Sequence, residues 1–176
     1  GACAVDAVQK GLRVSILDWD VHYGQGVADI ANRHENMRYV SIHQTPDFPY
    51  EGERYRQEKN VMTLPMPPDT TWTCGYSDLF DEALDFISNE NWQPDLVIVC
   101  AGYDALASDE LASTCLSAAD YGRMTRRLCE HLSDTKPTIM LGLEGGYQLA
   151  DSGPSGNLPD AVVETVRALV EQKDFR

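Results

Sequence analysis

The sequence predicts an α/β fold in which a mostly parallel sheet is flanked by helices. Short apolar runs of strand length recur along the chain, and stretches with helical spacing lie between them. Strands that alternate with helices form parallel sheets, because the chain crosses over through a helix between neighbouring strands. The chain has 176 residues, enough for one domain with a sizeable core.

Four apolar runs are predicted to be buried strands of this sheet. The runs are Val14–Leu17, Tyr39–Ile42, Leu96–Ala101 and Thr138–Leu143. The segment Gln44–Thr73 is rich in proline, charge and aromatic residues, and is predicted to be a long loop with a short extended piece at Val61–Leu64. Loops of that length inside a domain are often functional.

Five stretches are predicted to be helices. The first ends at Gly11, which suits a helix end because glycine tolerates the left-handed conformation. Pro159 suits the first turn of the last one, where its missing N–H would have no partner. The predicted helices are Ala4–Lys10, Gln25–Arg33, Ser77–Ser88, Ala118–Leu132 and Pro159–Glu171.

Charge and hydropathy narrow the class of protein. Acidic residues number 28 and Lys plus Arg 14, a formal net charge of −14. Such a surface repels nucleic acid, so no direct nucleic-acid partner is expected. It could attract basic peptides or polyamines, although solubility alone is the weightier explanation. No apolar run reaches the roughly 20 residues that span a bilayer, so no membrane partner is expected.

The cysteines indicate a reducing compartment. The chain has five, with no CxxC pair, which argues against a disulfide framework and a cysteine-rich zinc module. Cys100 stands in an apolar run and is predicted to be a core residue. An intracellular location, in the cytoplasm or nucleus, is therefore expected. An organelle stays open, because a start at Gly1 rather than Met indicates that the natural N-terminus is missing, with any targeting segment.

Polar groups that are unusual in a core follow each predicted strand. In open parallel sheets, ligands bind at the carboxyl ends of the strands, so these groups are expected to meet at one edge. They are Asp18, Asp20 and His22 after the first strand, His43 after the second, Gly102–Asp104 after the third and Glu144–Tyr147 after the fourth.

Asp18, Asp20 and His22 are spaced by two residues, so in an extended chain they point to the same side. Carboxylates and an imidazole crowded in this way favour a cation between them, and zinc accepts such ligands. Asp104 adds a third carboxylate from another strand end, which completes the pattern of a catalytic zinc site. For Asp104 alone, a turn or helix-cap role is an equally good interpretation.

Four collinear segments resemble those of zinc-dependent histone deacetylases, especially class II and bacterial members. The resemblance covers essentially the whole chain. It implies the arginase/deacetylase fold, and implies that residues 1–176 are the C-terminal part of a single deacetylase catalytic domain whose N-terminal portion is incomplete. The segments are Leu17–Gly26, Ser41–His43, Ala101–Ala105 and Leu143–Leu149.

The resemblance also implies the reaction, removal of acetyl groups from acetyl-lysine in histones or other proteins. Asp20, His22 and Asp104 are implied to be the Zn²⁺ ligands. Zinc would polarise the amide carbonyl, and a histidine would take a proton from water and return it to the leaving amine. Tyr147 is implied to donate its hydroxyl to the developing oxyanion.

Supporting roles follow from the same resemblance. Asp18 is implied to orient the catalytic histidine and to share a structural K⁺ site with the Ser41 hydroxyl and backbone carbonyls that include that of Ile42. Gly145 and Leu111 are implied to line the acyl-lysine tunnel.

The histidines depart from the family pattern. The family carries two adjacent histidines upstream of the first metal segment, whereas none of the four histidines here precedes Asp18. The general base is therefore expected to be absent, and this chain alone is expected to be inactive. His43 is interpreted as a packing or hydrogen-bonding residue rather than an extra ligand, His34 and His131 as surface residues, and Trp19 as a core residue.

Three other functions remain open from the sequence. An acetylpolyamine amidohydrolase would use the same motifs. An arginase-like manganese hydrolase would need further Asp ligands to bridge two metals, and only one cluster is present. A non-catalytic module could keep the metal or the acyl-lysine pocket, but the presence of all three ligands and of Tyr147 argues against it.

Overall fold

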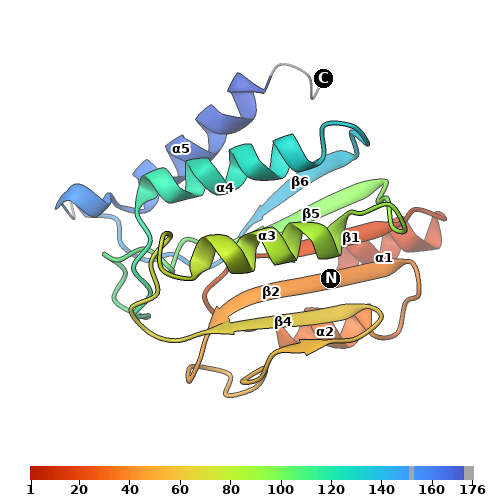
Figure 1. Cartoon of the computed structure of the whole chain (residues 1–176), viewed down its shortest axis with the longest axis horizontal. Helices are drawn as coiled ribbons and strands as arrows, with labels where there is room; N and C mark the ends of the chain where they lie inside the picture. Colours follow the sequence, from red (N-terminus) through yellow and green to blue (C-terminus); the bar gives the residue numbers. More distant parts are fainter. Residues whose placement is uncertain (151–152, 173–176) are drawn as a thin grey trace.

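A six-stranded sheet, in the order β3-β4-β2-β1-β5-β6, forms the centre of the fold (Figure 1). The computed structural model describes residues 1–150 and 153–172. Five of the strands run parallel, and β3 pairs antiparallel with β4 at one edge. The prediction of a mostly parallel α/β fold is confirmed. The strands are β1 (Val14–Asp18), β2 (Met37–Gln44), β3 (Arg56–Gln57), β4 (Val61–Met66), β5 (Leu96–Ala101) and β6 (Thr138–Leu143).

Helices cover both faces of the sheet (Figure 1). Helices α3, α4 and α5 contribute to one apolar core, and α1 and α2 contribute to the other. All five predicted helices are present with slightly shifted ends, and Gly11 follows the first with φ +88°. None of the described helices is long and apolar enough to cross a membrane. The helices are α1 (Ala2–Gln9), α2 (Gln25–Ala31), α3 (Tyr76–Ile87), α4 (Ala118–His131) and α5 (Leu158–Glu171), with a short 3₁₀ turn at Gly153–Ser155.

The predicted loop at Gln44–Thr73 contains more strand than expected: its extended piece at Val61–Leu64 is confirmed as part of β4, but the rest of the prediction is wrong. The segment contains β3 and all of β4, which pairs with β2 along its whole length. Pro65 hides the end of this strand in the sequence, because proline lacks the N–H that a central strand uses. It is tolerated here because β3 pairs only with Met62 and Thr63, so the outer edge of β4 is free at Pro65.

The prediction that Thr138–Leu143 is buried is also wrong, although the strand itself is confirmed. β6 lies at the edge of the sheet, and Met140 and Leu143 are 36% and 73% exposed. The pattern of residues in the strand cannot distinguish an edge position from a central one. By contrast, Cys100 and Trp19 are buried, as predicted.

The strand order reverses between β1 and β5. The chain proceeds from β1 outward through β2 to β4, then returns across the sheet to β5 on the other side of β1. Ligands bind at such switch points, in the crevice outside the carboxyl ends of the diverging strands. Asp18 ends β1, and Asp104 follows β5 closely. The topology therefore places the segments that carry Asp18 and Asp104 at the same crevice.

Ser15 joins β1 to the end of α3 and to Trp92, and so provides a test of the core packing. Its hydroxyl donates to the carbonyl of Ile87 at 2.7 Å and accepts from Trp92 Nε1 at 2.8 Å, and Ser15 is fully buried. Ser15→Ala leaves both partners without this bond and is expected to lower the free energy of unfolding by about 1–3 kcal/mol. Urea denaturation would measure this, with exposed Ser133→Ala as the control. Equal stability of the two variants would contradict the assignment.

Candidate metal centre

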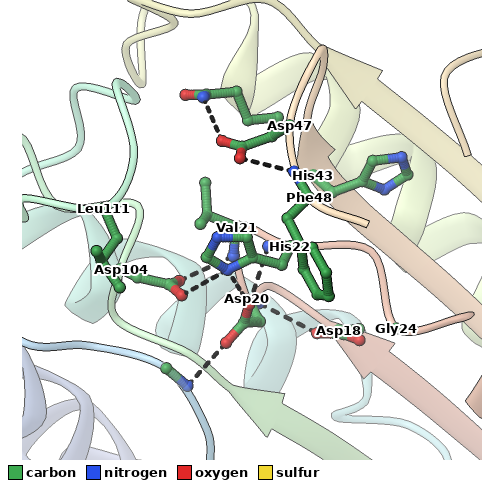
Figure 2. A network of polar contacts seen from close by, with 12 residues as sticks. Asp18, Asp20, Val21, His22, Gly24, His43, Asp47, Phe48, Asp104 and Leu111 are labelled. Atoms are coloured by element: carbon green, nitrogen blue, oxygen red, sulfur yellow. Dashed lines mark hydrogen bonds and ion pairs between the residues drawn. The ribbon is translucent and has the colours of Figure 1, made fainter. Parts of the chain in front are cut away.

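Asp20, His22 and Asp104 meet at the switch point, each offering a ligand atom within 4.8 Å of the others (Figure 2). His22 Nδ1 lies 3.2 Å from Asp20 Oδ1 and 3.0 Å from Asp104 Oδ2. Among the residues that the structure describes, this is the one cluster of three or more such side chains. The three predicted metal ligands are thus brought together by segments 82 positions apart.

The segment after β1 is shaped by bonds to the end of β5. The N–H of Trp19 donates to the carbonyl of Cys100 at 3.2 Å, and the N–H of Val21 donates to Asp104 Oδ1 at 2.9 Å. Trp19 and Val21 are fully buried, while Asp20 and His22 stay partly accessible. Alternate residues of this segment therefore point into the core and into the crevice, as the two-residue spacing predicts.

Two glycines allow the segments to approach each other. A Cβ on Gly145 would stand 2.1 Å from Asp104 Oδ2 and 2.7 Å from Asp20 Oδ2, and a Cβ on Gly102 would stand 2.3 Å from Asp20 Oδ2. The N–H of Gly145 instead donates to Asp20 Oδ2 at 2.8 Å. Any side chain at Gly145 would occupy the space between the two carboxylates, so the residue shapes the site itself.

The three groups form a site suited to a cation. Hydrogen bonds with Asp104 and then Asp20 raise the pKa of His22 to about 10. Burial works to raise the pKa of Asp20, but its bonds with His22 and Gly145 lower it overall, whereas burial raises the pKa of Asp104. A proton on His22 therefore serves two carboxylates. One imidazole nitrogen and two carboxylate oxygens are the donor types that zinc accepts, so the residues fit the ion.

Asp18 lies behind Asp20, His22 and Asp104 rather than among them. It is 3% exposed, and its carboxylate accepts from the N–H of Asp20 at 3.1 Å and from the Tyr39 hydroxyl at 2.8 Å. Burial, and next the charge of Asp20, raise the pKa of Asp18 well above its ordinary value. Ser41 pairs with Asp18 in the sheet, and Ile42 follows it, both buried on β2.

Tyr147 and Leu111 are both exposed, at 56% and 55%. Tyr147 borders a cavity of about 440 Å³ together with Asp18, His22 and Leu143. Burial, then the nearby carboxylates Asp104, Asp20 and Asp109, raise the pKa of Tyr147. In the view of Figure 2, Leu111 lies on the Asp104 side of the His22 ring.

Sequence reasoning missed Phe48 and Tyr39. The Phe48 ring lies 6.5 Å from that of His22, and in Figure 2 it stands on the side of His22 away from Leu111. The aromatic, proline-rich character of its loop was a signal, but no spacing singled out one residue. The sequence signal for Tyr39 was weaker: a tyrosine inside a buried strand needs a hydrogen-bond partner for its hydroxyl.

The other histidines lie away from the metal cluster. His43 bonds to the Ser41 hydroxyl at 2.9 Å and to the carbonyl of Gly52 at 2.9 Å, which agrees with a hydrogen-bonding role. His34 and His131 are half-buried rather than freely exposed, which corrects the expectation of surface residues. His131 Nε2 contacts the carbonyl of Ser88 at 2.9 Å, because the last turn of α4 packs beside the end of α3.

Known proteins resemble this chain over most of its length. A family model described as the histone deacetylase domain matches residues 2–157. An uncharacterised protein, slr0245 of Synechocystis, is 40% identical over 161 residues, which are 90% of this chain and 49% of that protein. A probable deacetylase of Archaeoglobus fulgidus is 32% identical over 156 residues, 83% of this chain and 42% of that protein.

A solved structure of the HDA15 HD domain superposes with a TM-score of 0.76 at 26% identity, covering 97% of this chain and 48% of that one. The chain thus spans about half the length of the relatives it matches. The family match extends over the segments that follow β1, β5 and β6. The chain belongs to the histone deacetylase family.

Proposed function

We propose that this chain supplies the metal ligands and the oxyanion donor of a zinc-dependent amidohydrolase that removes acetyl groups from acetyl-lysine in histones or other proteins. The observation that carries the proposal is the convergence of Asp20, His22 and Asp104 within 4.8 Å at the switch point, with Tyr147 on the rim of the same crevice. Family membership supports the deacetylase chemistry.

The ligands divide the work of holding the ion. Zinc, when bound, supplies a Lewis acid that polarises an amide carbonyl and makes water more nucleophilic. Asp20 would hold it through Oδ1, Asp104 through Oδ2 and His22 through Nδ1, the atoms that face one another. Val21 and Gly145 donate backbone N–H groups to these carboxylates and so fix their orientation.

Tyr147 is suited to donate a proton in a hydrogen bond. Its pKa is raised, so the hydroxyl stays protonated at neutral pH. A hydroxyl at the rim can stabilise the charge that develops on the carbonyl oxygen as the amide is attacked. The general base is expected to come from a histidine outside this chain, because His43 and His131 are engaged elsewhere and His34 follows the far end of α2.

Asp18 would contribute to a structural potassium site. Its buried carboxylate forms no ion pair with a cationic side chain among the described residues, although burial opposes its charge. A monovalent cation beside Asp18 and its sheet neighbour Ser41 would neutralise that charge.

Acetylated polyamines are the alternative substrates, favoured by the net charge of −14. Rates of the complete protein on acetylspermidine and on an acetyl-lysine peptide would separate the two classes. An arginase-like two-manganese site is less well supported, because the described residues hold one ligand cluster rather than two. A module that only binds metal or acyl-lysine would show zinc binding without turnover in the complete protein.

Loss of a ligand carboxylate tests the metal centre. Asp20→Asn is expected to weaken zinc binding by more than the roughly 10- to 100-fold typical of losing an outer partner, because a ligand itself loses its charge. Isothermal titration calorimetry on the metal-free chain would measure this. Asp29→Asn, on an exposed carboxylate of α2, is the matched control. Equal zinc affinities in the two variants would refute the site.

The metal-free chain should show a pH-dependent stability that depends on His22. Its pKa of about 10 in the folded chain lies above the ordinary 6.5, so its ion pairs stabilise the fold fully below about pH 6.5. That contribution disappears as the pH rises through about 10. Thermal melting of wild type and His22→Asn across this range should give a difference that shrinks with rising pH. A constant difference would contradict the assigned ion pairs.

Activity assays test both the missing base and Tyr147. The zinc-loaded 176-residue chain is expected to give no turnover of an acetyl-lysine peptide, because it lacks the catalytic histidine. In a complete protein containing this chain, Tyr147→Phe should lower kcat by about 100- to 1000-fold, the usual cost of an oxyanion donor. Robust turnover by the isolated chain, or full activity of Tyr147→Phe, would overturn the respective role.

A further inference from the structure

Residues 107–116 form a loop that carries Leu111 on the Asp104 side of His22 (Figure 2) and bonds to Tyr147 through Asp109; we call it the mouth loop. The base of the loop is closed by two backbone bonds, from the N–H of Ala107 to the carbonyl of Leu116 at 2.8 Å and from the N–H of Leu116 to the carbonyl of Ala105 at 3.1 Å. Its tip carries Leu111. Two buried polar side chains, Asp109 and Gln44, connect this loop to the other two segments around the crevice.

Asp109 connects the mouth loop to the segment after β6. Its side chain is buried, with 7% of the residue exposed, and each carboxylate oxygen has one backbone donor. The N–H of Leu111 donates to Oδ1 at 3.0 Å, and the N–H of Tyr147 donates to Oδ2 at 2.8 Å. The two donors lie 36 residues apart (147 − 111) in the sequence. One carboxylate therefore fixes Leu111 and Tyr147 relative to each other.

Gln44 connects the mouth loop to the segment that carries Phe48. It is 6% exposed, and its Oε1 accepts from the N–H of Ser113 at 2.9 Å and from Thr114 Oγ1 at 3.1 Å. Its Nε2 donates to Asp47 Oδ2 at 2.7 Å, and Asp47 Oδ1 accepts the N–H of Phe48 at 2.7 Å (Figure 2). These partners fix the orientation of the amide group, because only its nitrogen can donate to Asp47.

The backbone of Gln44 also reaches the metal segment. Its N–H donates to the carbonyl of Val21 at 2.9 Å, between the ligands Asp20 and His22. The mouth loop, the Phe48 segment and the ligand segment therefore share one buried residue.

The side chains that these contacts support have little packing of their own. Phe48, Leu111 and Tyr147 are 62%, 55% and 56% exposed. A side chain that is mostly in solvent is positioned by its backbone, because few neighbours restrict it. Asp109 accepts the backbone N–H groups of Leu111 and Tyr147. Asp47, which Gln44 holds, accepts that of Phe48.

We propose that Asp109 and Gln44 are positioning residues that hold Phe48, Leu111 and Tyr147 around the metal ligands, so that an acyl chain entering the crevice meets preset walls. The positions of Leu111 and Phe48 stand on geometry alone. The catalytic consequence through Tyr147 rests on the proposed function.

Amide hydrogen exchange tests the geometry without metal or turnover. In Asp109→Asn an NH₂ group replaces one acceptor oxygen, so at least one of the Leu111 and Tyr147 amides loses its partner. Its exchange should rise by about tenfold or more, the factor expected for losing a charge-assisted hydrogen bond, while the Ser113 amide stays unchanged. Glu110→Gln, on the exposed neighbouring carboxylate, is the matched control. Unchanged exchange at both amides, or a uniform rise across the chain, would overturn the role of Asp109.

A charge swap tests Gln44. Gln44→Glu keeps the acceptor for Ser113 and Thr114 but places a second carboxylate against Asp47. The exchange of the Phe48 amide should rise and that of Ser113 should not. Adding Asp47→Asn restores a donor between the two side chains, with its direction reversed, and should restore protection of the Phe48 amide. Failure of the double variant to recover would refute this connection.

The affinities of two hydroxamates for the zinc-loaded chain then test whether Phe48, Leu111 and Tyr147 form walls for an acyl chain. Acetohydroxamate contacts the metal centre alone, whereas octanohydroxamate also places its chain along the crevice. Asp109→Asn and Gln44→Glu should weaken octanohydroxamate by about tenfold and leave acetohydroxamate within about twofold. Equal losses for both probes, or none, would contradict the proposal. If neither probe binds the wild-type chain, the proposed metal centre fails, and the exchange experiments still decide the positioning roles.

Discussion

The Asp104 carboxylate is the contact on which the site depends. One of its oxygens accepts the N–H of Val21, and the other faces the imidazole of His22. Because Asp104 follows β5 and its partners follow β1, a single side chain closes the crevice where the strand order reverses. The glycines at 102 and 145 then allow the neighbouring segments to approach these carboxylates without a side chain between them.

This arrangement concentrates negative charge that the fold by itself does not favour. Asp18 and Asp104 are buried, and burial raises the pKa of both. His22 supplies one positive charge to Asp20 and Asp104, whereas among the described residues Asp18 pairs with hydrogen-bond donors and no cationic side chain. Cations bound beside these carboxylates would therefore stabilise the folded chain.

The rim follows a different physical rule from the ligand cluster. Asp20, His22 and Asp104 contact one another directly, whereas the side chains of Phe48, Leu111 and Tyr147 are largely exposed to solvent. Their backbones are held by Asp47 and Asp109, two carboxylates that do not touch the ligands in the described residues. Gln44 joins Asp47 to the mouth loop. The entrance is thus held by carboxylates other than those of the cluster, and the backbone of Gln44 joins it to Val21, between Asp20 and His22.

The sequence by itself determined the α/β class, most of the strands and helices, and the grouping of Asp20, His22 and Asp104, because periodicity and the polar residue after each strand are local signals. It missed the extent of β4, since Pro65 interrupts the pattern, and the edge position of β6, since strand order is not a local property. Only the tertiary structure decided the roles of Tyr39, Gln44, Phe48 and Asp109. Their partners lie up to 69 or 70 positions away, as for Gln44 with Ser113 and Thr114, and contacts between distant segments leave no spacing to recognise.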